Sequence, residues 1–247
     1  MVRRRTKHVQ QSLVLNTWGG KREGAGRPRK GPRASAPHKK RADVKATQPL
    51  HVTLRVENDV GTLRRREQYQ ACRKALRCVL GRHDFRVVEI SLQDRHLHLL
   101  VEAASKVALA RGMQAFEISA ARHINRALSE ARRVRRRGRV FSDRYHARVL
   151  RSPRQVRHAL AYVLNNWRRH EEDHGPESMF WTIDPYSSAI HFSGWRELDG
   201  RRSSVPERHE PLPVGAAESW LLRVGWRRHG LISVREVPGP RIQKLVA

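Results

Sequence analysis

Residues 93–103 constrain the fold and the chemistry of this chain more than any other stretch. They read Gln-Asp-Arg-His-Leu-His-Leu-Leu-Val-Glu-Ala. At the two-residue period of a β-strand, one face of this stretch is apolar and consists of Leu97, Leu99, Val101 and Ala103. His96 and His98 share the other face, where neither imidazole is needed for packing. The strand therefore carries either two solvated or hydrogen-bonded histidines or a pair of rings that hold one divalent cation.

The net charge limits what this chain acts on. Lysine and arginine number 51 against 23 aspartate and glutamate residues, which gives a formal charge of +28 over 247 residues. So large an excess points to a polyanion as the partner. Nucleic acid is the first polyanion to expect, and an anionic membrane surface is the second.

The sequence predicts neither a membrane span nor export. No apolar run approaches the ~20 residues that a transmembrane helix needs. The basic N-terminus lacks the apolar segment of a signal peptide, so we expect the chain to stay in the cytoplasm. The only two cysteines, Cys72 and Cys78, point in different directions from one predicted helix, and they predict neither a disulfide framework nor a zinc site.

Residues 1–48 are predicted to form a basic arm that is disordered when free. Glycine, proline, lysine and arginine dominate the segment, which ends close to Lys39, Lys40 and Arg41. Such a segment buries too little apolar surface to offset the entropy lost on ordering. It is either a phosphate-binding arm whose contribution falls steeply with salt, or a solvated tail that merely attracts polyanions.

Residues 49–175 alternate strand and helix patterns, which predicts one α+β domain. In chain order the patterns indicate a strand over 50–56, a helix over 69–80, strands over 85–92 and 96–103, a helix over 105–131, a strand over 141–150 and a helix from 152. The short link between the second and third strands suits an antiparallel hairpin. This order is typical of the ferredoxin-like, split βαβ architecture, an antiparallel sheet with helices covering a face.

The last predicted helix of this domain has clear N-terminal capping residues and two polar residues four positions apart. Its first residues, 152–155, read Ser-Pro-Arg-Gln, which predicts a capping box with proline at the first helical position. Tyr162 and Asn166 are four residues apart and therefore stack on one side of the helix, at the edge of its apolar stripe. We expect a side chain at this edge to contact the sheet and also to reach a groove at the edge of the domain.

Basic residues gather after the second long helix and on the strand that follows it. The helix ends in a cluster that comprises Arg133, Arg135, Arg136, Arg137 and Arg139. This cluster is either a solvated loop or a clamp for a nucleic-acid backbone, and the net charge favours the clamp. Arg144 and Arg148 share the polar face of the predicted strand over 141–150, and we expect them to bind DNA as well.

Residues 176–247 form an aromatic-rich appendage that is too short for a large core of its own, so we expect it to pack on the central domain. Its aromatic residues include Phe180, Trp181, Tyr186, Phe192, Trp195, Trp220 and Trp226. Arginines are interleaved with the last two. These rings either stack on unpaired bases or form the core of the appendage.

Three motifs together resemble a known family. They are the His-Leu-His strand, the run Arg-Tyr-His-Ala-Arg-Val-Leu over 144–150, and the helix segment Tyr-Val-Leu-Asn-Asn over 162–166. Over about residues 49–175 the chain resembles the HUH (histidine-hydrophobe-histidine) single-tyrosine transposases, and within them the repeat (REP)-associated tyrosine transposases of bacteria. The resemblance implies that His96 and His98 are the metal-binding pair, that Tyr162 is the nucleophile, and that Asn166 completes the metal site. Family members often have proline where this chain has Trp167.

The resemblance also implies a reaction and its participants. A bound Mg²⁺ or Mn²⁺ ion, with positions left open for phosphate oxygens, offsets charge on the scissile phosphate. The tyrosine then forms a 5′-phosphotyrosine and frees a 3′-hydroxyl, and later rejoining needs no nucleotide cofactor. The expected substrate is single-stranded or hairpin DNA in the bacterial nucleoid. The enzyme acts either as a monomer in cis or as a homodimer that exchanges tyrosine helices.

Other interpretations of the same residues stay open. Without catalysis, the chain is a nucleic-acid-binding protein, such as a domesticated descendant of a transposase. A related HUH nickase for replication or conjugation initiation shares the chemistry. Tyr145 is a rival nucleophile, but it lies on a predicted strand without a polar partner at helical spacing. His146 and His158 are expected at the surface or in contact with DNA.

Overall fold

The computed structural model describes residues 43–172, 176, 178–198, 205 and 209–239. Most of the predicted basic arm, with Lys39, Lys40 and Arg41, lies outside the described residues. The division at residues 48 and 175 stays a prediction.

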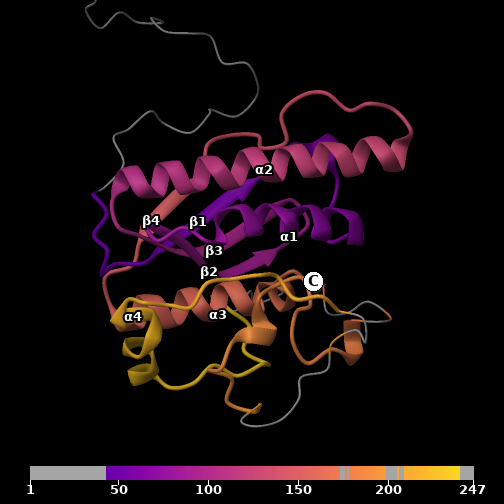
Figure 1. Ribbon diagram of the computed structural model, residues 1–247. Helices are drawn as coiled ribbons and strands as arrows, with labels where there is room; N and C mark the ends of the chain where they lie inside the picture. The colour runs from indigo at the N-terminus through magenta and orange to yellow at the C-terminus, as the bar shows by residue number, and fades with distance from the viewer. Residues whose placement is uncertain (1–42, 173–175, 177, 199–204, 206–208, 240–247) are drawn as a thin grey trace, which may run out of the picture. The chain divides into compact units, whose positions relative to one another are not determined.

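Four antiparallel strands form the sheet at the centre of the described chain (Figure 1). They are β1 (Leu50–Arg55), β2 (Phe85–Leu92), β3 (His96–Ala103) and β4 (His146–Val149), in the order β2-β3-β1-β4. Helix α1 (Arg66–Leu80) connects β1 to β2, and α2 (Lys106–Arg132) connects β3 to β4. Because β3 lies between β1 and β2, these elements form a split βαβ unit, and the predicted α+β, ferredoxin-like fold is confirmed.

Helices cover both faces of the sheet. Helices α1 and α2 lie on one face, where the apolar side of β3 packs into a continuous core (Figure 1). Helix α2 approaches β2 so closely at Gly112 that a Cβ atom there would lie 2.2 Å from the Phe85 ring, so only glycine fits. Helix α3 (Pro153–Arg169) covers the opposite face, which is the face that carries His98.

Two local predictions need correction. The strand predicted over 141–150 is interrupted: Phe141 pairs with Val56 in an isolated bridge, the chain leaves the ladder over 142–145, where the Arg144 N–H bonds the Asp143 Oδ1 at 2.7 Å, and β4 begins only at His146. The capping box of α3 is only half formed. Ser152 Oγ accepts from the Gln155 N–H at 3.3 Å, but Gln155 Oε1 accepts from the Arg151 N–H at 2.7 Å instead of returning to residue 152.

The C-terminal segment covers one edge of the sheet and the outer side of α3. The Leu92 N–H donates to the Tyr186 carbonyl and the Ser188 N–H donates to the Ile90 carbonyl, both at 2.8 Å, so residues 186–188 extend the sheet beyond β2. The segment packs on α3 through Ile183, Ala189, Trp195, Leu221, Leu222, Trp226, Ile232 and Val234. Trp195 and Trp226 therefore belong to the core, whereas Phe180 and Trp220 are 72% and 48% exposed.

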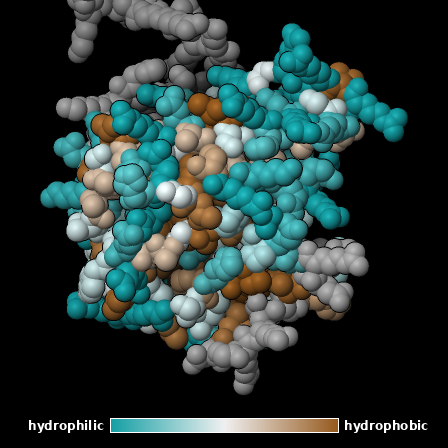
Figure 2. Space-filling view, viewed as in Figure 1, coloured by the Kyte–Doolittle hydropathy of each residue, from teal (hydrophilic) through white to brown (hydrophobic). Residues whose placement is uncertain are grey.

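Hydrophilic side chains cover most of the face seen in Figure 2, and apolar residues gather near its middle. Within the described part of the chain, no helix combines the length and the apolar composition that crossing a membrane requires. Cys72 is buried and Cys78 is exposed, as their positions on α1 predict.

A buried ion cluster around Arg64 connects three separate parts of the fold. Its guanidinium donates to both carboxylate oxygens of Asp184, at 3.0 and 3.1 Å, and to the Leu92 carbonyl at 3.0 Å. Glu172 lies 3.1 Å from the same guanidinium, and burial raises the pKa of this carboxyl group to about 7. The Tyr186 ring lies under the guanidinium, 4.5 Å from its carbon.

Replacing Arg64 by leucine should destabilise the protein strongly. The Asp184 side chain is 0% exposed and would be left as a buried carboxylate without its cation. Breaking such a pair costs about 3–5 kcal/mol of unfolding free energy, measurable by urea denaturation. The matched control is Arg126→Leu, because the Arg126–Glu130 pair is exposed and its loss should change the urea midpoint little. Equal midpoints for the two variants would contradict the structural role of Arg64.

Candidate active site

Helix α3 crosses the histidine-bearing face of the sheet and brings Tyr162 against β3. The Tyr162 ring meets the His98 ring edge to face, with centroids 5.1 Å apart and planes at 89°. The His96 ring lies 6.3 Å from the His98 ring in a stacked orientation. His98 is buried, whereas His96 stays exposed where β3 begins. The predicted nucleophile and histidine pair thus lie together within one chain.

Asn166 follows Tyr162 by one helical turn and is completely buried. Neither its Oδ1 nor its Nδ2 has a hydrogen-bond partner. A buried amide left in this state costs about 1–3 kcal/mol for each unsatisfied group. An amide oxygen held free inside the protein, on the side of the helix that faces the histidines, suits a ligand of a hard cation.

The environment of His98 keeps its ring neutral. Burial, and after it the neighbouring His51, His96 and His170, lower the pKa of His98 to about 3. Burial, followed by Arg55, also lowers the pKa of His96. A neutral imidazole has a free nitrogen lone pair, which metal ligation requires.

The orientation of the His98 ring is set by the pairing of β1 with β3. Thr53 lies directly opposite His98 in this pairing. Its Oγ1 is 3.3 Å from His98 Nδ1. A hydrogen bond at one ring nitrogen fixes the ring and directs the other nitrogen toward a ligand.

His51 is a member of this site that the sequence analysis missed. Its ring centroid lies 5.5 Å from that of His98 and 5.6 Å from that of Tyr162. Burial, His146 and Arg148 lower the pKa of His51 to about 4, and its Nε2 atom is buried without a hydrogen-bond partner. The sequence shows that His51 alternates with the apolar residues of β1, but only the pairing of β1 with β3 shows that it shares a face with His98.

His170 is a second residue that the sequence analysis did not consider. It caps α3 one turn after Asn166, where its N–H donates to the Asn166 carbonyl at 3.2 Å. It is exposed and close enough to His96 and His98 to lower the pKa of both. The side of α3 that carries Tyr162 and Asn166 thus ends in another imidazole.

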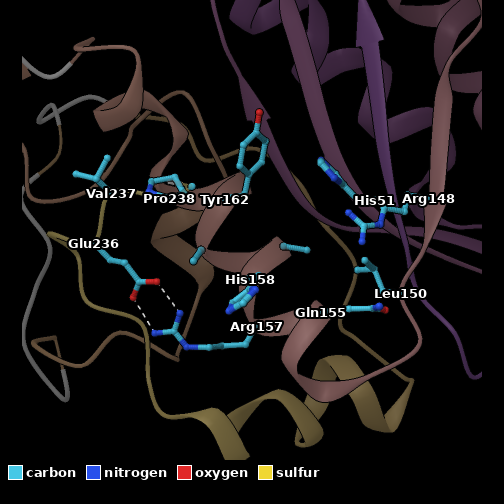
Figure 3. Close-up of a pocket in the computed structure, with 13 residues that line it drawn as sticks. His51, Arg148, Leu150, Gln155, Arg157, His158, Tyr162, Glu236, Val237 and Pro238 are labelled. Atoms are coloured by element: carbon cyan, nitrogen blue, oxygen red, sulfur yellow. Dashed lines mark hydrogen bonds and ion pairs between the residues drawn. The ribbon is translucent and has the colours of Figure 1, made fainter. Parts of the chain in front are cut away.

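A cavity of about 550 Å³ opens beside Tyr162 (Figure 3). His51 and Arg148 approach it from the sheet, α3 contributes Tyr162 and His158, and residues 236–239 close another side. Polar and basic groups at this position suit the sugar-phosphate backbone of a strand that reaches the tyrosine. An ion pair of 2.6 Å between Arg157 and Glu236 fastens the C-terminal wall of the cavity to α3.

The predicted DNA-binding arginines divide into two groups. Arg136 is structural, since its side chain is only 6% exposed, pairs with Asp59 at 2.8 Å and bonds the Arg139 carbonyl at 3.1 Å. Arg139 is exposed and pairs with Glu57 at 2.8 Å. The other members of the set present exposed side chains, namely Arg133, Arg135, Arg137, Arg144 and Arg148. Contact with DNA stays a prediction for the whole set.

The remaining candidates from the sequence do not join the histidine pair. Tyr145 is buried in the core on the α1 and α2 face of the sheet. His158 and His146 are exposed, and His158 reaches only the cavity beside Tyr162.

The side chains at the site determine which metal ligands it can offer. In the part of the chain that the structure describes, no group of three or more histidine, cysteine, aspartate or glutamate side chains is placed to hold a metal ion. Two imidazoles alone give an incomplete site. The unpartnered Asn166 amide, one helical turn after Tyr162, would supply a third donor, and the three side chains are of types that suit a cation with mixed nitrogen and oxygen ligands.

One family model and one solved structure are similar to parts of this chain. Residues 45–166 match the family model described as "Transposase IS200 like". No curated protein matches the chain. One solved structure, titled "Structure of the REP associates tyrosine transposase bound to a REP hairpin", is 16% identical, with a TM-score of 0.43, and the match covers 62% of this chain and 82% of that chain. The family match includes His96, His98, Tyr162 and Asn166, so the part of the chain that carries the candidate site is similar to the IS200-like transposases.

Proposed function

We propose that this protein is a metal-dependent transposase that cleaves and rejoins single-stranded or hairpin DNA through a 5′-phosphotyrosine. The observation that carries the proposal is the 5.1 Å contact between the Tyr162 and His98 rings in one chain, one helical turn from the unpartnered Asn166 amide. The family supports a transposase, and the net charge of +28 supports a polyanionic substrate.

Tyr162 supplies the nucleophile. Its phenolic oxygen loses a proton and bonds to the scissile phosphorus, and the bond from phosphorus to the 3′-oxygen breaks. The 3′-oxygen leaves with the electron pair and takes up a proton. The ester bond to the tyrosine conserves the energy of the broken phosphodiester. A 3′-hydroxyl, from the same strand or from another one, then reverses the attack without a nucleotide cofactor.

His96, His98 and Asn166 would hold the divalent cation, Mg²⁺ or Mn²⁺. When bound, this ion supplies Lewis-acid stabilisation of the charge that builds up on the phosphate. The fold orients these ligands before the ion binds. Burial keeps His98 neutral, Thr53 sets the direction of its ring, and α3 excludes water from the Asn166 amide.

The proposed reaction uses residues of a single chain. Tyr162 contacts His98 of its own sheet, so exchange of tyrosine helices between protomers is not needed. Arg148 lies in the cavity beside the tyrosine and would bind the phosphate backbone near the cleavage site. The exposed arginines of the loop after α2 would bind the DNA farther away. A monomer, or a homodimer in which each protomer uses its own tyrosine, satisfies this geometry.

Covalent trapping tests the proposal. The full chain would be incubated with a labelled pool of DNA hairpins that have randomised single-stranded flanks, with Mn²⁺ or with EDTA. We expect a protein-DNA adduct that survives denaturing electrophoresis and forms only with the metal. Absence of an adduct over the whole pool would instead support a protein that only binds nucleic acid. An adduct that forms equally in EDTA would contradict the role of the cation.

A further inference from the structure

The C-terminal segment exposes a tryptophan on two short helical turns that pack against α3. These turns are α4 (Trp220–Arg223) and the 3₁₀ helix Gly225–His229. Their inner side, with Leu222 and Trp226, belongs to the core around α3. On their outer side Trp220 is 48% exposed, although tryptophan is highly buried on average in folded proteins. Of the two tryptophans that arginines flank in this segment, only Trp220 is therefore at the surface.

Two neighbours hold the Trp220 ring in place. The ring lies so close to Gly225 that a Cβ atom on this residue would be 2.6 Å from it, so only glycine fits there. The Arg228 guanidinium carbon lies over the ring, 4.8 Å from its centroid, which is the distance of a cation–π contact. A ring that is already fixed loses little conformational entropy when a ligand packs on its exposed part.

The surface around Trp220 carries basic side chains and no acidic ones. Residues 219–235 contain no aspartate or glutamate. Three exposed arginines follow Trp220 on the two turns, namely Arg223, Arg227 and Arg228. Within the described part of the chain, none of the three forms an ion pair with a carboxylate, whereas Arg157 on the adjacent helix pairs with Glu236. Clustered charges of one sign repel each other, and an anionic ligand removes that repulsion.

We propose that this surface, which consists of Trp220, Arg223, Arg227 and Arg228, binds unpaired nucleotides of the DNA substrate away from the candidate active site. A base stacks on the exposed part of the indole, and the arginines contact the phosphates next to it. Surfaces that bind single strands without reading their sequence combine an aromatic ring with cations in this way. None of the four residues lines the cavity beside Tyr162, and all four lie beyond the family match. The inference rests on the proposed function only in taking single-stranded DNA as the ligand.

An anionic membrane is the other polyanion that a basic, aromatic surface suits, and the structure favours DNA over it. Binding to a membrane interface depends on the apolar area that enters the lipid. The outer side of these turns offers only Trp220 and Val224 as exposed large apolar side chains. Contacts between arginine and phosphate need no such insertion.

Removing the indole tests the stacking contact. Fluorescence anisotropy would measure binding of the full chain to oligo(dT) and to a blunt duplex of the same length, in EDTA so that no metal-dependent cleavage occurs. Trp220→Ala should weaken oligo(dT) binding about five- to a hundredfold, the contribution of one stacked base, and change duplex binding by less than about twofold. Trp220→Phe should keep most of the affinity, because a phenyl ring also stacks. Unchanged oligo(dT) binding in Trp220→Ala would overturn the proposal.

A matched aromatic control shows whether the position of the ring matters. Phe180 is 72% exposed and lies outside the surface around Trp220. Phe180→Ala should therefore leave oligo(dT) binding unchanged. Equal losses in Phe180→Ala and Trp220→Ala would mean that any exposed ring of this protein binds DNA, which contradicts a defined surface.

The salt dependence of binding tests the three arginines. In the triple variant Arg223/Arg227/Arg228→Ala, the slope of log affinity against log salt should decrease by about 2 for oligo(dT), because each phosphate contact with a single strand contributes about 0.7. The matched control removes the same charge from exposed positions on α1 and α2, namely Arg77, Arg111 and Arg122. Equal slopes for the two triple variants would show that only net charge matters and would refute the surface.

Photo-cross-linking of the wild-type chain gives a result that does not depend on how the variants fold. Oligo(dT) containing 5-iodouracil should cross-link to the peptide that contains Trp220, as identified by mass spectrometry. Cross-links confined to other peptides would contradict the proposal. Vesicles of phosphatidylserine test the membrane alternative. If Trp220→Ala abolished vesicle binding and left oligo(dT) binding intact, the surface would be a membrane contact.

The DNA-binding surface and the enzyme can fail separately. Adduct formation at Tyr162 together with unchanged oligo(dT) binding in Trp220→Ala would refute only the surface. Binding that depends on Trp220, without an adduct from any hairpin, would refute only the catalytic proposal.

Discussion

Replacing Tyr162 by phenylalanine should abolish the covalent protein-DNA adduct. The substitution removes the only atom that bonds to phosphorus, and loss of a nucleophile typically lowers turnover by on the order of a thousandfold or more. The phenyl ring keeps the edge-to-face packing on His98 and the contact with His51. Folding and DNA affinity should therefore remain close to wild type, as checked by thermal melting and by anisotropy with the same hairpin pool.

Tyr145→Phe is the matched control for this experiment. It makes the same chemical change in a tyrosine that is buried on the opposite face of the sheet. We expect the adduct to form at a rate within a few-fold of wild type. Retention of the adduct in Tyr162→Phe, or its loss only in Tyr145→Phe, would show that the wrong tyrosine has been assigned.

Replacing Asn166 by leucine should change activity and stability in opposite directions. Leucine has a similar volume but no polar atoms, so the two unsatisfied amide groups disappear. The metal-free protein should gain up to about 1–3 kcal/mol of unfolding free energy, because the desolvation cost of those groups is removed. Adduct formation should fall by about 100-fold or more, and Mn²⁺ should no longer raise the melting temperature. Urea denaturation in EDTA and melting with Mn²⁺ measure the two effects.

The adjacent residue provides a sharp control. Asn165 is equally buried, but its Nδ2 donates to the Ser233 carbonyl at 2.9 Å. Asn165→Leu should therefore destabilise the protein by leaving that carbonyl without its partner, while the melting shift with Mn²⁺ persists. If Asn166→Leu were the less stable of the two variants and kept its response to Mn²⁺, the Asn166 amide would be an ordinary structural group.

Those parts of the site that depend on local periodicity were predictable from the sequence. The period of two placed His96 and His98 on one face of a strand, and the spacing of four placed Tyr162 and Asn166 on one side of a helix. The structure joins these two pairs because α3 covers the face that carries the histidines. His51 could not be placed beside His98 from the sequence alone, because the two residues are 47 positions apart. Only the pairing of β1 with β3 explains why their ring centroids lie 5.5 Å from each other.

Interactions between distant residues are what sequence reasoning could not show. Arg136 stands in a run of arginines that looks uniformly basic, yet its guanidinium pairs with Asp59, 77 residues earlier in the chain. Glu89 interrupts an apolar strand, and only the fold shows that Ser188 meets it from the C-terminal segment. Composition predicts whether such residues are exposed on average, but one partner from a distant part of the chain can decide whether a particular side chain is buried and paired.

The packing of α3 shows which parts of the chain hold Tyr162 in place. The family match stops at residue 166, inside the helix that carries the tyrosine. One side of that helix rests on the sheet, and its other side rests on side chains between residues 183 and 234. Residues outside the family match therefore help to set the position of the Tyr162 side chain. A substitution in this C-terminal segment could therefore shift the Tyr162 ring relative to His98 without changing any residue of the family match, and in the proposed reaction such a shift would alter the rate of DNA cleavage.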